Sequence, residues 1–86
     1  MADLFIIIKR KYFDQIKDGS KKEEYREITQ YWSNRLIDRQ YDNVIFQAGY
    51  QKQSPRLKVK FKGVKIKQIT HEFFNNEPKE VFAIQL

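Results

Sequence analysis

The sequence RLKVKFKGVKIKQI at residues 56–69 gives the clearest strand signal in this chain of 86 residues. Apolar residues alternate with lysines up to Gly63, which predicts a β-strand with one apolar and one charged face. After Gly63 the alternation shifts by one position. One inserted residue at a glycine is typical of a β-bulge, and bulges bend sheets into barrels. The apolar positions are Leu57, Val59 and Phe61 before the glycine and Val64 and Ile66 after it.

The positive charge of the chain is concentrated around this predicted strand. The chain has 17 Lys and Arg against 11 Asp and Glu, a net charge of +6. Residues 43–71 contain no carboxylate and carry a net +7, whereas residues 1–42 carry +1 and residues 72–86 carry −2. A block of one sign indicates a polyanion partner, although alternating lysines also keep a strand from pairing with another chain. The lysines expected to contact nucleic acid are Lys58, Lys60, Lys62, Lys65 and Lys67.

The other patterns predict one α+β domain over residues 1–86, because the chain has room for a single core. We expect a small β-barrel of about five strands with two short helices. Further strands are expected at Leu4–Lys9, Asn43–Ala48 and Glu80–Leu86, a helix at Arg10–Asp18, a loop at Gly49–Pro55 and a turn at 75–78.

Residues 19–26, with the sequence GSKKEEYR, contain charges of both signs and no aliphatic side chain. They begin at a glycine suited to end the preceding helix. The spacing Gly-x-Lys-x-x-Glu-x-Arg, formed by Gly19, Lys21, Glu24 and Arg26, resembles the signature of the ASCH family. The resemblance implies a PUA-like fold, with the motif lining a cleft between the barrel and the helices. It also implies RNA, or a nucleoside or nucleotide, as the ligand.

The segment around this motif allows two structures. Ser20 and Glu23 form a capping box and apolar residues recur at helical spacing, which favours one helix over Lys21–Ile37. The resemblance implies instead a strand at Glu23–Ile28, followed by a helix at Gln30–Leu36 that Thr29 caps. We expect the second arrangement, since function can override local preference.

Glu24 and Arg26 stand on one face of such a strand. The simplest role for them is an ion pair that neutralises both charges at the barrel wall. In a binding cleft, Arg26 would donate to a phosphate or a base edge and Glu24 would accept from amino groups. Lys21 would contact a phosphate in the same cleft. Further ligand contacts are expected from a basic rim and from an aromatic loop residue: Lys9, Arg10 and Tyr50.

Two other classes of function remain possible from the sequence. Some relatives that resemble this chain in the motif hydrolyse acylated cytidine, and there the motif lysine is implicated as the nucleophile, with a threonine at the position of Glu24. Here a carboxylate would hold the proton on the Lys21 ammonium, which opposes nucleophilic attack. A hydrolase of a modified nucleoside or of RNA, using Lys21 and Glu24, is therefore the second hypothesis. A protein-interaction domain is the third.

Several kinds of site are disfavoured by composition. The chain has no cysteine and one histidine, His71, so that a metal site would need carboxylates. A hydrolase that uses Glu24 as general base would also need an acid partner, and neither Glu72 nor Glu77 is selected for that role by spacing. We expect no metal and no cofactor. The apolar run after Met1 is too short for a membrane span and lacks the flanks of a signal peptide. We therefore expect a cytoplasmic protein without a membrane partner. We also expect a monomer.

Overall fold

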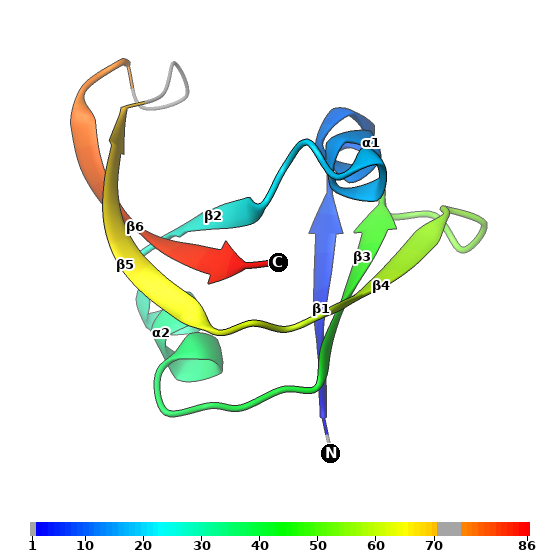
Figure 1. The fold of residues 1–86 in the computed structure, drawn as a ribbon, viewed down its shortest axis with the longest axis horizontal. Coiled ribbons are helices and arrows are strands. Elements are labelled where there is room, and N and C mark those ends of the chain that lie inside the picture. The colour runs from blue at the N-terminus through cyan, green and yellow to red at the C-terminus, as the bar shows by residue number, and fades with distance from the viewer. Residues whose placement is uncertain (1, 71–74) are drawn as a thin grey trace.

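The computed structural model describes residues 2–70 and 75–86, in which two helices and six strands form an α+β domain (Figure 1). The α+β class predicted from the sequence is confirmed. His71 and Glu72 lie outside the described residues. The elements in chain order are β1 (Asp3–Ile8), α1 (Arg10–Asp18), β2 (Glu23–Glu27), α2 (Gln30–Leu36), β3 (Asn43–Ala48), β4 (Arg56–Lys60), β5 (Val64–Thr70) and β6 (Pro78–Gln85).

The described strands form two three-stranded sheets. In the first sheet, β3 lies between β1, which is parallel to it, and β4, which is antiparallel. In the second sheet, β6 lies between β2 and β5 and is antiparallel to both. The sheets are not closed on each other (Figure 1). The predicted barrel is therefore wrong, and so is the count of about five strands.

The division of residues 56–69 at Gly63 explains both corrections. The Phe61 amide donates to the Asp42 carbonyl beside the first sheet, whereas the Lys62 amide donates to the Gln85 carbonyl of β6. Gly63 has a backbone φ of +100°, a conformation that residues with a side chain rarely adopt. Its carbonyl accepts a hydrogen bond from the Gln85 amide at 2.8 Å. The glycine thus marks a corner where the chain passes from one sheet to the other, not a bulge within one strand.

The apolar side chains of both sheets meet in one core, which α1 and α2 complete. The central strand β6 contributes four consecutive residues with almost no exposed area, Val81–Ile84. A strand buried on both faces shows no alternation of apolar and polar residues. The core cluster consists of Leu4, Ile6, Ile8, Phe13, Ile16, Leu36, Val44, Phe46, Phe82 and Ile84.

The segment around the motif adopts the two-element arrangement, so the single helix over 21–37 is wrong. Gly19 ends α1 with φ 86°, and its amide donates to the Ile16 carbonyl at 3.2 Å. Thr29 caps α2, because its Oγ1 accepts from the Trp32 amide at 3.2 Å. Pairing of β2 with β6 overrides the helical pattern. Within the described residues, no helix combines the length and hydrophobicity that a membrane span requires.

Candidate functional site

The motif residues Lys21, Glu24 and Arg26 form a compact group of charges. Glu24 lies on β2 opposite Ile84 of β6, and only 5% of its surface is exposed. Its Oε2 is 2.7 Å from Arg26 Nη2, and its Oε1 is 3.5 Å from Lys21 Nζ. Alternation along β2 places Glu24 and Arg26 on one face, and the turn after α1 brings Lys21 to the same carboxylate. We call these three residues the charge triad.

Aromatic rings hold both cations of the charge triad. The Lys21 ammonium lies 5.2 Å from the ring centroid of Tyr12 and 5.1 Å from that of Tyr25. The Arg26 guanidinium lies 5.2 Å from the ring centroid of Trp32 on α2. Cations within about 6 Å of a ring are attracted to its negative face. Trp32 therefore packs against the core and supports Arg26, and it does not stand open as a platform for base stacking.

The charge triad is largely closed to solvent. Arg26 Nη2 also donates to the Ile7 carbonyl at 3.4 Å, while its buried Nε has no hydrogen-bond partner within the described residues. Burial raises the pKa of Glu24, and the charges of Arg26 and Lys21 oppose this rise. These contacts agree with the simpler role considered from the sequence, in which Glu24 and Arg26 neutralise each other at the wall of the domain.

A surface hollow of about 570 Å³ lies beside the charge triad. Lys21 reaches it, whereas Glu24 and Arg26 are not among its lining residues. Its floor includes Glu23, which accepts hydrogen bonds from Tyr25 Oη at 2.8 Å, Gln85 Nε2 at 2.8 Å and Lys67 Nζ at 2.9 Å. The full lining is Gln15, Ser20, Lys21, Lys22, Glu23, Tyr25 and Gln85. The hollow therefore combines two lysines and the Glu23 carboxylate with several neutral donors and acceptors.

The network around Glu23 predicts a specific pH dependence of stability. Hydrogen bonds from Lys67, Gln85 and Tyr25 lower the pKa of Glu23 from 4.5 to about 2. The resulting stabilisation is complete above about pH 4.5 and is lost as the pH falls towards 2. We expect Glu23→Gln to lower the free energy of unfolding by about 1 kcal/mol at pH 6, since Lys67 is half exposed.

Urea unfolding of the wild type and Glu23→Gln between pH 2 and pH 6 measures this effect. The two proteins should converge in stability at the acid end of the range. Comparing them cancels the contributions of other carboxyls, including Glu24, whose pKa shift has the opposite sign. An equal deficit at pH 2 and pH 6 would show that Glu23 stabilises the fold without its charge.

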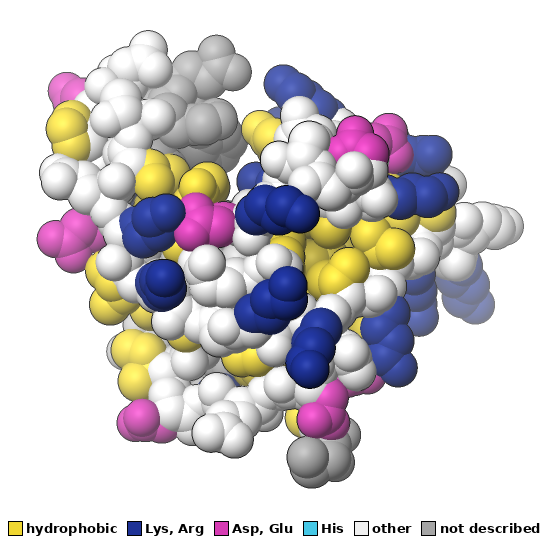
Figure 2. Space-filling view, viewed as in Figure 1, with side chains coloured by type: hydrophobic (Ala, Val, Ile, Leu, Met, Phe, Trp, Pro, Cys, Tyr) yellow, Lys and Arg dark blue, Asp and Glu magenta, His cyan; other side chains and the backbone are white. Residues whose placement is uncertain are grey.

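The lysines predicted to contact nucleic acid are all exposed, and we call them the lysine row. Figure 2 shows dark blue side chains over β4, the connection after it and β5. The row crosses from one sheet to the other at Gly63. Lys67 pairs with Glu23, while the other four lysines have no carboxylate of the described residues within ion-pair distance. Its members are Lys58, Lys60, Lys62, Lys65 and Lys67.

The remaining predicted ligand residues lie apart from the hollow beside the charge triad. Lys9 directly precedes α1 and is exposed. Arg10 pairs with Asp14 one turn further along α1, at 3.0 Å. Tyr50 follows β3 and is 88% exposed, as a stacking residue would be. None of Lys9, Arg10 and Tyr50 lines this hollow.

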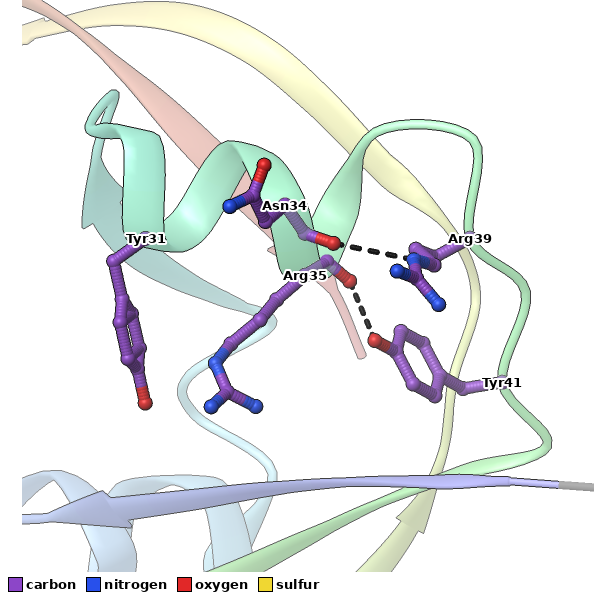
Figure 3. Close-up of a pocket in the computed structure, with 5 residues that line it drawn as sticks. All are labelled: Tyr31, Asn34, Arg35, Arg39 and Tyr41. Carbon is purple, nitrogen blue, oxygen red and sulfur yellow. Dashed lines mark hydrogen bonds between the residues drawn. The ribbon is translucent and has the colours of Figure 1, made fainter.

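Sequence reasoning missed a second hollow, of about 350 Å³, at the end of α2. Arg35 stacks on Tyr31 there, with the guanidinium carbon 4.3 Å from the ring centroid. The spacing of these two residues by four positions in a helix was the available signal. The lining residues, shown in Figure 3, are Tyr31, Asn34, Arg35, Arg39 and Tyr41.

Comparisons with protein-family models, curated proteins and solved structures find no match to this chain. Among residues 2–70 and 75–86, no group of three or more His, Asp or Glu side chains is arranged to hold a metal ion. The geometry offers unpaired cations along an exposed row and beside two hollows. Such groups bind anions, above all phosphates, by charge and hydrogen bonding.

Proposed function

We propose that this chain is an RNA-binding module of the ASCH type, related to the PUA-like folds. The observation that carries this proposal is the lysine row, in which four exposed lysines have no carboxylate partner among the described residues. Uncompensated lysines attract the phosphate backbone of a nucleic acid and release its counterions. Because the row crosses both sheets, its charges follow an extended path that suits a polynucleotide better than a single small ligand.

The hollow beside the charge triad adjoins one end of this row. Lys67 of the row donates to Glu23, which lines the hollow, so that the two surfaces are continuous. A volume of about 570 Å³ lies within the range of small-molecule sites. One nucleotide of a bound RNA would place its phosphate near Lys21 and Lys22 there. Glu24 would not contact the RNA itself. Its ion pair with Lys21 would position the lysine at the hollow.

The hydrolase alternative has less support. Lys21 contacts the Glu24 carboxylate and the faces of two tyrosine rings. These contacts hold the Lys21 side chain against a carboxylate and two rings, whereas a nucleophilic amine must be free to approach its substrate. Glu24 is buried, both of its oxygens contact cations and it does not line the hollow, so it is poorly placed to reach a water or a ribose hydroxyl there.

Replacement of Lys60 and Lys65 tests the proposal, because these two lysines lie on different sheets. We expect the double variant Lys60→Gln/Lys65→Gln to bind single-stranded RNA about tenfold more weakly at low salt. The slope of log K against log salt should fall by about 1.4, since each phosphate contact contributes about 0.7 for single strands. Fluorescence anisotropy with a labelled mixed-sequence oligonucleotide, measured from 25 to 200 mM salt, gives both quantities.

The matched control is Lys11→Gln/Lys17→Gln on α1, which removes the same net charge from exposed positions outside the row. It should keep most of the affinity. If both double variants weaken binding equally, attraction depends on net charge alone and the lysine row is not the RNA surface. Absence of any RNA binding by the wild type at low salt would favour a protein-interaction domain instead.

A further inference from the structure

The hollow at the end of α2 contains two arginines whose charges are not neutralised locally. No carboxylate of the described residues lies within ion-pair distance of Arg35 or Arg39. In Figure 3 the side chains of Tyr31 and Arg35 lie side by side on one side of α2. Arg39 and Tyr41 approach from the segment after the helix. Two guanidinium groups thus border one small space.

Two of these side chains donate hydrogen bonds to backbone carbonyls at the end of α2. Arg39 Nε donates to the Asn34 carbonyl at 3.1 Å, and Tyr41 Oη donates to the Arg35 carbonyl at 2.5 Å. The last carbonyls of a helix lack partners within the helix and repel anions. Because side chains bind these carbonyls, the negative end of the helix is capped. The terminal Nη groups of Arg39 are not used by this cap.

Aromatic contacts restrain two side chains of the hollow, Arg35 and Tyr41. Stacking on Tyr31 holds the plane of the Arg35 guanidinium. The Tyr41 ring packs edge-on against Phe61, with the ring centroids 5.4 Å apart. Preorganised donors lose less conformational entropy when a ligand binds. The arrangement is therefore better suited to recognition than two unrestrained surface arginines would be.

We propose that this hollow is a phosphate-binding site, in which Arg35 and Arg39 together contact one phosphate group. Guanidinium groups present paired donors that match phosphate oxygens. A volume of about 350 Å³ accommodates a phosphate with an attached sugar. The phosphate could belong to a free nucleotide or to an RNA chain. No residue of the lysine row lines this hollow, and the proposal does not depend on the proposed function.

Backbone amide NMR spectra test the site with three probes: inorganic phosphate, uridine monophosphate and uridine. We expect the first two to shift the amides of residues 31–41 in a saturable manner, and uridine to leave them unchanged. Arg35→Gln should weaken the binding of uridine monophosphate about tenfold, since it removes charge-assisted hydrogen bonds. Arg35→Lys keeps the charge but loses the paired donors, and should give a smaller loss.

The matched control is Arg10→Gln, because Arg10 is an exposed helical arginine that already has a carboxylate partner. It should bind uridine monophosphate as the wild type does, and so should Lys11→Gln/Lys17→Gln. A short oligouridylate distinguishes the source of the phosphate. Shifts of residues 31–41 with the oligonucleotide alone assign the site to RNA phosphodiesters. No saturable shift with any phosphate-bearing probe, or equal affinities of Arg35→Gln and the wild type, would overturn the proposal.

Discussion

Replacement of Glu24 by alanine is expected to lower the free energy of unfolding by about 3–5 kcal/mol, as is typical when one partner of a buried ion pair is removed. The carboxylate lies 2.7 Å from the Arg26 guanidinium and 3.5 Å from the Lys21 ammonium. Without it, the contacts that Arg26 would keep among the described residues are the Ile7 carbonyl and the face of Trp32. Lys21 lines the open hollow and can turn its ammonium towards water there, whereas the Nε of Arg26 is buried, so most of the loss comes from Arg26.

A double-mutant cycle isolates this contribution. Buried ion pairs can often be replaced by apolar residues of similar volume at little cost. The variant Glu24→Met/Arg26→Met should therefore recover most of the stability that Glu24→Met loses alone. Urea unfolding at pH 7, followed by circular dichroism, provides the four free energies. If the double variant is as unstable as the sum of the two single variants, Glu24 and Arg26 do not stabilise the fold as a pair.

The same double variant separates the structural role of the motif from a role in binding. If it folds and still binds RNA with an unchanged salt slope, Glu24 and Arg26 serve the fold, and the lysine row carries recognition. If it folds and loses affinity, the charge triad itself contributes to the RNA site. Glu24→Ala alone cannot distinguish these cases, because the expected loss is a large part of the roughly 4–13 kcal/mol available to a domain of this length.

Secondary structure could be predicted from the sequence where neighbouring residues determine it, as at the ends of the two helices. Gly19 ended a helix because its φ of 86° favours glycine, and Thr29 began the next because its hydroxyl caps a free amide. The strand at 23–27 had no such local signal, since its residues suit a helix equally well. Pairing with β6, about 60 positions away, decides its structure. Such long-range pairing is visible only in the folded chain.

The division of residues 56–69 between two sheets shows a second limit. Alternation correctly marked Gly63 as the irregular position, but an inserted residue produces the same shift of parity at a bulge and at a corner between sheets. The choice depends on which strands pair on either side, β3 before the glycine and β6 after it. The predicted barrel assumed one continuous ladder of hydrogen bonds through this point.

In the candidate sites too, local spacing could be predicted from the sequence, but contacts between distant segments could not. A spacing of two along a strand places Glu24 and Arg26 on one face, but it does not tell whether that face is open or closed. Closure depends on Trp32 and Tyr12, which come from two different helices. The arginine hollow depends on the segment between α2 and β3. That segment has no periodic pattern from which the approach of Arg39 to Asn34 could be predicted.

Phe82→Ala is the second substitution for which we expect a large effect, a loss of about 3–5 kcal/mol in the free energy of unfolding. Phe82 lies in the centre of β6, is 1% exposed and belongs to the core cluster. Because β6 pairs with β2 and β5, a cavity at this position weakens the packing of the whole second sheet. Thermal and urea unfolding measure the loss directly.

Ile66→Ala provides the matched control, since Ile66 is the residue of β5 directly opposite Phe82. Ile66 is 59% exposed, so that truncating it removes little buried area, and we expect a loss below about 1 kcal/mol. The two residues are direct partners across β5 and β6, and burial is the main difference between their positions. A large loss from Ile66→Ala would mean that this face of β5 is covered in solution. The expected monomer would then have to be tested by sedimentation.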